Sequence, residues 1–414
     1  MKVFIRTFGC SMNLADSEAM AGVLLEEGHC ITDETNADVI IVNTCTVKDA
    51  TDKKILAYLK KQSKPLVIAG CMAEVDMELF KGKVIVGVKG IGSIGRAVRT
   101  AYQGRTGLFL NGTLDRLSLP VERTGTVSAI IPIAQGCLGS CSYCRTRLAR
   151  GVLHSYHSDD IIRCCQKAIA AGAKELWLTA EDTAAYGKDS GESLFSLIES
   201  VSALQGDFRI RLGMANPKYV LDNLDEFIEV FQNPKLYSFL HIPVQSGSNR
   251  ILRAMNRLYS REGFLRIVKS LRENIKDITI CTDLICGYPG ESDEDFAASM
   301  DLIREACPDL LHISGYSTRP GTEAALLPAL SRKVVRQRTG MAASLFACIA
   351  RQRNRGWHGW KGLVLAVAKG KGDTTIARNF AYRQVIIPER IPIGEMRQVK
   401  VLSSTAHYLL ARIC

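Results

Sequence analysis

Three cysteines in one short loop constrain this sequence more than any other feature. Cys137, Cys141 and Cys144 stand in the segment QGCLGSCSYC, with three and then two residues between the thiols. The apolar run at 129–133 just before them is typical of a buried strand. Three thiolates this close can hold three irons of a [4Fe–4S] cluster and leave the fourth iron without a protein ligand. Such an iron suits chelation of the amino and carboxylate groups of S-adenosylmethionine.

The alternative for this loop is a structural zinc site. Such sites normally use four protein ligands, and the loop supplies three. His154 is the nearest candidate for a fourth ligand. The spacing therefore favours a cluster with one open iron, at which S-adenosylmethionine is cleaved to a 5′-deoxyadenosyl radical.

A second group of cysteines is scattered along the first part of the chain. Cys10, Cys45 and Cys71 end the segments FIRTFGC, VIIVNTC and LVIAGC, each an apolar run followed by a helical pattern. In a parallel sheet the loops after the strands meet at one edge, so three thiols could meet around one metal centre. Free cysteine is also a common small core residue. The spacing alone leaves both interpretations open.

The order of apolar runs predicts an α/β protein in three parts. Residues 1–103 alternate strands and helices, which predicts a parallel sheet domain, and 104–126 lose the pattern and form a linker. Residues 127–350 contain six strand–helix units, too few for a closed eight-unit barrel, so we expect a partial barrel with its site at the carboxyl ends of the strands. Five short strands in 351–414 predict a small antiparallel β-barrel.

Composition and charge narrow the class of protein. Fourteen cysteines, with no signal peptide and no apolar run long enough to span a bilayer, favour a cytoplasmic protein without a membrane partner. The net charge is +11, and the tail from Arg355 holds ten basic residues against three acidic ones, or +7 of the total. A concentrated basic module is typical of nucleic-acid binding.

The motifs together resemble the radical S-adenosylmethionine methylthiotransferase family. The resemblance is carried by FGCSMNLADSE, NTCTV, GCMAE, QGCLGSCSYC, LTAEDTAAYGKD, HIPVQSGSNRILRAMNR, TDLICGYPGESDEDF and YSTRPGTEA, and it covers essentially the whole chain. It implies that Cys137, Cys141 and Cys144 bind the radical-generating [4Fe–4S] cluster. It also implies that Cys10, Cys45 and Cys71 bind an auxiliary [4Fe–4S] cluster that carries the sulfur, and that 351–414 form a TRAM-like RNA-binding barrel.

The resemblance also bears on the substrate. YSTRPGTEA is similar to the tRNA-acting branches, and GCLGSCSYCRTRLARGVLHSY and MANP are similar to the archaeal and eukaryotic branch. That branch implies insertion of a methylthio group at C2 of N6-threonylcarbamoyladenosine in a tRNA anticodon stem-loop, with RNA rather than DNA as partner and with an electron donor and a sulfur source still to be identified. The alternatives are isopentenyladenosine in tRNA or an aspartate of a ribosomal protein. Arg145 and the TAED segment depart from the family pattern.

The same resemblance suggests further binding residues, while no acid–base catalyst is assigned. Tyr143 either packs on the adenine of S-adenosylmethionine or packs within its loop, and Arg150 either grips phosphate or orders the site. His241 and His312 are interpreted as satisfied core or wall groups. The candidates for binding S-adenosylmethionine are Tyr143, Glu181, Asn216, Gln245, Ser246 and Gly287, and those for binding RNA are Arg319, Arg378 and Arg383.

Overall fold

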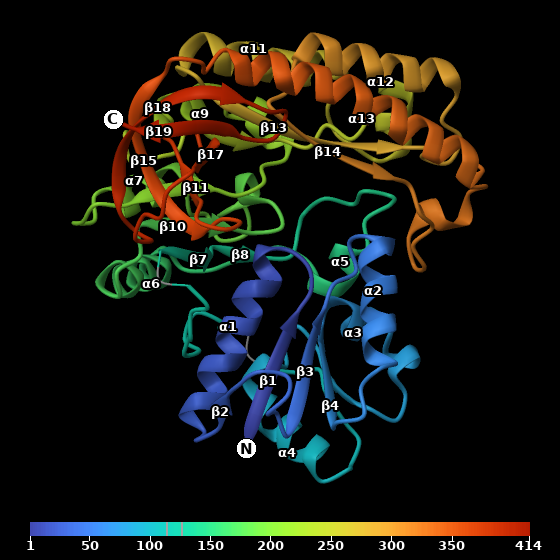
Figure 1. Cartoon of the computed structure of the whole chain (residues 1–414). Coiled ribbons are helices and arrows are strands. Elements are labelled where there is room, and N and C mark those ends of the chain that lie inside the picture. The colour runs from blue at the N-terminus through green and yellow to red at the C-terminus, as the bar shows by residue number, and fades with distance from the viewer. Residues whose placement is uncertain (113–114, 126) are drawn as a thin grey trace.

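The computed structural model describes residues 1–112, 115–125 and 127–414, and it divides them into three parts (Figure 1). Thr113, Leu114 and Thr126 belong to the predicted linker and lie outside the described residues. The mixed α/β class with a small β-barrel at the carboxyl end is confirmed. None of the described helices combines the length and the apolar character needed to cross a membrane.

The first part is a six-stranded parallel sheet in the order β2-β1-β3-β4-β5-β6. Its central strand VIIVNT is buried throughout, as expected for a parallel strand covered on both faces. Helices α1 and α4 pack on one face, and α2 and α3 on the other. The elements are β1 (Lys2–Thr7), α1 (Ser11–Glu26), β2 (Cys30–Ile31), β3 (Val39–Thr44), α2 (Asp49–Leu59), β4 (Leu66–Gly70), α3 (Cys71–Val75), η1 (Met77–Phe80), β5 (Val84–Val86), η2 (Ile91–Ser93), α4 (Ile94–Tyr102) and β6 (Gly107–Phe109).

The predicted linker begins too early. Strand β6 lies inside it and pairs with β5, so that Val86 faces Phe109 across the ladder. Phe109 packs against the core between the sheet and helices α1 and α4. The later part of the linker returns to α1, where Thr124 donates its backbone N–H to the Glu18 carboxylate at 3.1 Å. Three residues are too short for a strand signal in the sequence, so only the packing of Phe109 reveals this strand.

The second part contains six parallel strands in two three-stranded sheets, β11-β10-β7 and β12-β13-β14. Isolated bridges from Ile210 to Leu236 and from Met214 to His241 join the two sheets into one curved wall. The elements are β7 (Ser128–Pro132), β8 (Ala134–Gln135), α5 (Thr146–Arg150), β9 (His154–Ser155), α6 (Ser158–Ala170), β10 (Glu175–Thr179), η3 (Thr183–Ala185), α7 (Leu194–Ser202), β11 (Arg209–Leu212), α8 (Pro217–Asp222), α9 (Leu224–Val230), β12 (Phe239–His241), α10 (Asn249–Ala254), α11 (Arg261–Asn274), β13 (Thr279–Cys286), α12 (Asp293–Ala306), β14 (Leu310–Gly315), η4 (Glu323–Leu326) and α13 (Arg332–Arg355).

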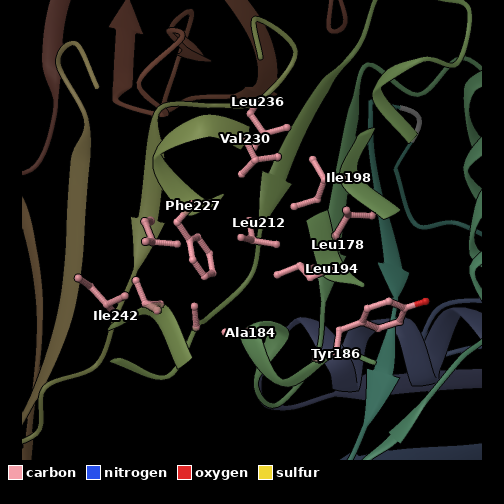
Figure 2. Close-up of a cluster of buried hydrophobic side chains, with 14 of the residues drawn as sticks. Leu178, Ala184, Tyr186, Leu194, Ile198, Leu212, Phe227, Val230, Leu236 and Ile242 are labelled. Carbon is pink, nitrogen blue, oxygen red and sulfur yellow. The ribbon is translucent and has the colours of Figure 1, made fainter. Parts of the chain in front are cut away.

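The two faces of this wall differ in character. Side chains alternate along each strand, so Leu178 and Leu212 point outward into the main core beneath the helices (Figure 2). Their neighbours Trp177 and Arg211, which pair across β10 and β11, therefore point to the concave inner face. Trp177 and Arg211 are only half-buried, so this inner face is not sealed.

The third part is a closed five-stranded barrel in the order β15-β16-β17-β19-β18. The prediction of five strands is met, but β17 and β19 pair in parallel, so the barrel is not wholly antiparallel. Helix α13 continues to Arg355, and the boundary expected at 350/351 therefore falls inside a helix. The strands are β15 (Lys361–Lys369), β16 (Thr375–Arg378), β17 (Gln384–Ile387), β18 (Met396–Ser404) and β19 (Leu409–Ile413).

The barrel docks on the second part through buried charges. Arg378 pairs with Glu175, and Arg383 pairs with Asp309, each of these carboxylates having a fully buried side chain. Asp309 also accepts hydrogen bonds from Arg353 Nε at 2.7 Å and from the backbone N–H of Ile280 at 2.9 Å. Burial raises the pKa of Asp309, but Arg383 and Arg353 outweigh it and hold that pKa below its usual range.

Asp309→Asn is expected to destabilise the protein by about 3 kcal/mol, because it removes the charge that compensates buried arginines while leaving them in place. Urea denaturation followed by tryptophan fluorescence measures the change. The matched control is Asp373→Asn, whose exposed pair with Arg390 should contribute less than about 1 kcal/mol. Equal effects of the two substitutions would contradict the role assigned to Asp309.

Candidate functional site

The three amino-terminal cysteines converge at the carboxyl edge of the first sheet. Cys10 precedes α1, Cys45 follows β3 and Cys71 begins α3. Cys10 Sγ lies 3.6 Å and Cys71 Sγ 3.8 Å from Oδ1 of Asn13. A Cβ atom on Gly9, whose φ is +118°, would lie only 2.8 Å from Cys45 Cβ, so this glycine lets the first and second loops approach. The structure thus brings the thiols together, while their role as metal ligands stays a prediction.

Asn13 fixes the position of these loops. Its side chain is fully buried, and its Nδ2 donates to the carbonyl oxygens of Phe8 at 3.0 Å and of Thr44 at 2.7 Å. Asn43 in turn donates to the backbone oxygen of Asn13 at 2.7 Å. The sequence analysis did not single out Asn13, although it stands three residues after Cys10 in the motif FGCSMN.

Arg150 connects this group of thiols to the loop of the second part. It ends α5 and is 2 % exposed. Its Nε donates to Cys71 Sγ at 3.3 Å, and its terminal nitrogen donates to Asp16 at 2.6 Å and to Asn13 Oδ1 at 3.2 Å. Glu181 lies 3.5 Å from the same guanidinium. Of the two roles considered for Arg150, ordering of the site is therefore the one that its contacts support.

The second set of thiols lies in the loop between β8 and α5. The backbone N–H of Gly139 donates to Cys137 Sγ at 3.2 Å, and Arg257 donates to Cys141 Sγ at 3.2 Å. Cys144 closes a turn in which its N–H bonds to the carbonyl oxygen of Cys141 at 3.0 Å. Each sulfur-directed donor stabilises negative charge on sulfur. Arg257, from the segment MNR that follows α10, was not predicted.

Electrostatics favour metal coordination over free thiolates at both places. Burial raises the pKa of Cys71 to about 11 and that of Cys137 to about 12. Burial also raises the pKa of Cys45 and of Cys144. These thiols stay protonated near neutral pH unless a metal displaces the proton. These four thiols are therefore poor nucleophiles at neutral pH, and their binding of metal stays a prediction.

The spacing of the thiols suits a cluster better than a single ion. Zinc lies about 2.3 Å from sulfur, which puts the sulfurs of a tetrahedral site roughly 3.8 Å apart. Within the described residues, neither cysteine trio has its three sulfur atoms within 4.8 Å of one another. His154, the fourth zinc ligand considered, packs edge-on against Tyr156. The spacing therefore speaks against a single zinc ion at either trio, and an iron–sulfur cluster at each stays a prediction.

A polar group also lies on the inner face of the partial barrel. His241 and His312 both bond to Oδ1 of Asp283, at 2.9 and 2.8 Å, and Cys281 lies beside them. Burial raises the pKa of Asp283, but the two imidazoles outweigh it and hold that pKa far below its usual range. The ligand atoms of His241, Cys281 and His312 lie within 4.8 Å of one another, yet the carboxylate already satisfies both rings. The histidines are wall groups, as expected.

Three of the residues predicted to bind S-adenosylmethionine have other structural roles. Ser246 is fully buried, with its Oγ 3.3 Å from that of Ser299. Asn216 caps helix α8 by accepting the N–H of Lys218 at 3.2 Å. A Cβ on Gly287 would lie 2.5 Å from a methyl group of Val335, so helix α13 requires this glycine. Each side chain or position therefore also serves packing within the protein, and its binding of S-adenosylmethionine stays a prediction.

The other three residues remain near the loop of the second thiol group. Tyr143 packs against Ile251, Met255 and Tyr288, which matches the loop-packing alternative. Glu181 accepts the N–H of Gly136 at 2.9 Å and faces Arg150. Gln245 has φ +72° and no side-chain hydrogen bond within the part of the chain that the structure describes. Binding of S-adenosylmethionine by these residues stays a prediction.

The arginines predicted to bind RNA face inward. Arg319 is 7 % exposed and pairs with Asp52 of the first part. Arg378 and Arg383 pair with the buried carboxylates Glu175 and Asp309 described above. Carboxylates of the protein pair with all three charges in this structure, and binding of RNA by these residues stays a prediction. The sequence shows that the tail is basic but not which of its cations point outward.

Comparison with known families matches two parts of the chain. Residues 2–87 match the model described as uncharacterized protein family UPF0004. Residues 131–303 match the radical SAM superfamily. The first range contains Cys10, Cys45 and Cys71, and the second contains Cys137, Cys141 and Cys144.

Curated relatives align with this chain over its full length. A probable threonylcarbamoyladenosine tRNA methylthiotransferase of Pyrococcus horikoshii is 41% identical and covers 100% of this chain and 99% of its own. The corresponding protein of Methanothermobacter thermautotrophicus is 42% identical, with 99% of each chain covered. The threonylcarbamoyladenosine tRNA methylthiotransferase of Homo sapiens is 36% identical over 99% of this chain and 73% of its own.

Solved structures show the same fold at low identity. The radical S-adenosylmethionine methyltransferase TsrM from Kitasatospora setae, with cobalamin and a [4Fe-4S] cluster bound, has a TM-score of 0.57 at 13% identity and covers 78% of this chain and 76% of its own. The cobalamin-dependent S-adenosylmethionine radical enzyme OxsB has a TM-score of 0.54 at 9% identity, covering 83% and 56%. At these identities the likeness concerns the fold alone.

Proposed function

This chain belongs to the threonylcarbamoyladenosine branch of the radical S-adenosylmethionine methylthiotransferase family, and on that premise we propose that it inserts a methylthio group at C2 of N6-threonylcarbamoyladenosine in tRNA. The observation that carries the proposal is the presence of two separate thiol trios joined by Arg150, one in each matched region. A single trio would suffice for a radical, but a second is needed to hold the sulfur that is inserted.

We assign one [4Fe–4S] cluster to each trio. When bound, one S-adenosylmethionine and the cluster on Cys137, Cys141 and Cys144 would supply the radical that removes hydrogen from C2, the cluster on the other trio would supply the sulfur, and a second S-adenosylmethionine would supply the methyl group on that sulfur. Our candidates for binding S-adenosylmethionine are the same six residues as in the sequence analysis: Tyr143, Glu181, Asn216, Gln245, Ser246 and Gly287. The electrons and the replacement sulfur come from partner molecules that are still unidentified.

The chain itself holds the two trios at a fixed separation. Arg145 of the second part pairs with Asp76 of the first, with a nitrogen–oxygen distance of 2.7 Å. Arg319 reaches Asp52, and Arg150 reaches Asp16, so three buried ion pairs join the same two parts. Buried pairs require good geometry to be stable, which favours one arrangement of the parts. A fixed separation matters because a reacting carbon must lie close to both centres.

A row of cations on the carboxyl-terminal barrel is the surface that we assign to RNA. Lys361 faces Lys400 across β15 and β18, and Lys400 faces Arg412 across β18 and β19. All three point outward, since Val399 and Val401 on either side of Lys400 are buried. Like charges directly opposite one another destabilise a sheet. Within the described residues none of the three has an ion-pair partner, so the row suits phosphates of a tRNA backbone.

We place the reaction in the cytoplasm. The structure has fourteen free cysteines, several of them exposed. Thiols in that number persist in a reducing compartment, which also favours assembly of oxygen-sensitive clusters.

An adenosine beside the anticodon lies in a single-stranded loop, from which its base can be turned out at modest cost.

The two-cluster assignment predicts the iron content. Replacing Cys10, Cys45 and Cys71 together with Ala should remove roughly half of the iron of the anaerobically reconstituted protein. Asn13→Leu, which keeps every thiol but removes the amide that orders them, should cause a similar loss. Asn36→Leu, at an exposed asparagine of the same domain, serves as the control. Full iron in the triple variant would contradict a cluster at this site.

The proposed reaction predicts a change in tRNA nucleosides. In a strain that lacks the gene, mass spectrometry should find threonylcarbamoyladenosine without its methylthio form. The wild-type gene should restore the modification and Cys141→Ala should not, because that thiol belongs to the radical-generating trio. Cys414→Ala, at an exposed terminal cysteine, should restore it fully. Unchanged methylthio content would refute the proposal, and a lost mass increment on a ribosomal protein would favour the protein-modifying alternative.

The cation row predicts a smaller salt dependence of tRNA binding. Changing Lys361, Lys400 and Arg412 to Gln should lower the slope of log K against log salt by about 2 to 3, since each phosphate contact contributes close to one. A matched triple variant at Lys53, Lys269 and Arg304 removes the same charge from exposed intrahelical ion pairs and should leave the slope unchanged. Equal slopes for both variants would place the RNA elsewhere.

A further inference from the structure

Arg211 lies on the inner face of the partial barrel among three aromatic rings. Its guanidinium carbon is 5.3 Å from the ring centre of Trp177, 5.2 Å from that of Phe239 and 5.4 Å from that of Tyr382. Tyr382 comes from the carboxyl-terminal barrel, so docking of that barrel completes the group. Rings that face a cation hold it in place without neutralising its charge.

The guanidinium of Arg211 has no anionic partner in the described part of the chain. Its Nε is buried and has no hydrogen-bond partner. Arg150, Arg319, Arg378 and Arg383, by contrast, each pair with a carboxylate. A cation without a partner among apolar groups destabilises the folded protein. An arginine at such a position is easier to explain when an anionic ligand pairs with it during function.

The position of Arg211 relative to the thiol trios is set by the strand register. Arg211 pairs with Trp177 across β10 and β11. Two residues further along β10, Thr179 Oγ1 lies 3.0 Å from Oγ of Ser11, which directly follows Cys10. Two residues of strand span about 6.6 Å. Arg211 therefore lies about one layer of side chains away from Ser11 and the neighbouring Cys10, on the inner face of the partial barrel.

The distance from the amino-terminal trio to Arg211 is similar to the length of a substituent on the N6 atom of a purine. A base whose C2 faces the trios at the strand ends can direct the group on its N6 atom inward along the barrel. The inner face stays open to solvent at this level, since Trp177 and Arg211 are half-buried and the side chain of His312 is 55% exposed. A threonylcarbamoyl group ends in a carboxylate, which a guanidinium binds through two parallel hydrogen bonds.

We propose that Arg211 binds the carboxylate of the threonylcarbamoyl group and thereby selects adenosines whose N6 substituent is anionic. The inference rests on the proposed function and adds the residue that decides the substrate. An apolar N6 substituent such as isopentenyl would cover the guanidinium without pairing its charge, which is how a polar site rejects an analogue that lacks the matching group.

The test crosses two enzymes with two substrates. Anticodon stem-loop RNAs carry the threonylcarbamoyl group either with its free carboxylate or as the neutral threoninamide. The wild-type enzyme is expected to prefer the carboxylate RNA by about 10- to 100-fold in kcat/KM, the range for a hydrogen-bonded charge pair. Arg211→Met should lose that preference by slowing only on the carboxylate RNA, and Arg211→Lys should keep part of it.

Controls separate this role from a structural one. Arg209→Met removes a guanidinium from the same strand that donates to the backbone oxygen of Pro234, and it should leave the preference intact. Equal losses of Arg211→Met on both RNAs, or no preference in the wild type, would overturn the inference and leave the proposed function standing.

A binding measurement keeps the two claims distinguishable. If the wild type methylthiolates neither RNA, the proposed function fails. Equilibrium binding of the two stem-loops to the reconstituted protein then still tests the contact. A 10-fold or larger preference for the carboxylate RNA that Arg211→Met abolishes supports it, on the magnitude expected of such a pair. Equal dissociation constants for the two RNAs contradict it.

Discussion

The arrangement of this protein depends on one buried cation that crosses between two domains. Arg150 ends helix α5, which follows the loop of Cys137, Cys141 and Cys144, yet its guanidinium donates to Cys71 and Asn13 in the other domain and pairs with Asp16 there. Such a charge is stable inside a protein only when its partners are correctly placed. The position of one thiol trio therefore constrains the other, which a reaction at a carbon between them requires.

The carboxyl-terminal barrel divides its basic residues between two tasks. Arg378 and Arg383 fix the barrel to the core through Glu175 and Asp309, and Tyr382 between them reaches the aromatic group around Arg211. The cations on the opposite surface, in the row from Lys361 to Arg412, are left without partners within the described residues. The sequence of this module is basic throughout, but some of its cations fix the barrel to the core while others lie on its surface, where we propose that they bind RNA.

The inner face of the partial barrel carries an anionic group, Asp283, and a cationic group, Arg211. Asp283 is already satisfied by two imidazoles and is strongly anionic, whereas Arg211 keeps an unmatched positive charge among aromatic rings. The contrast indicates that the first group shapes the wall, while the second is available to a ligand. Specificity for a charged substituent would then come from a residue distant from every motif that marks the chemistry.

The sequence by itself determined what local patterns encode. Alternating apolar runs predicted a parallel α/β domain, six strand–helix units and a five-stranded barrel. Cysteine spacing pointed to the trio of Cys137, Cys141 and Cys144, whereas the trio of Cys10, Cys45 and Cys71 was implied by the family resemblance. It did not determine the partner of any single charge. Arg319, Arg378 and Arg383 were expected to bind RNA, and in the structure they pair with carboxylates 74 to 267 residues away, which is beyond the reach of any local rule. Only tertiary packing decides such pairs, because a long side chain has the same local signature whether it faces solvent, a phosphate or a buried carboxylate.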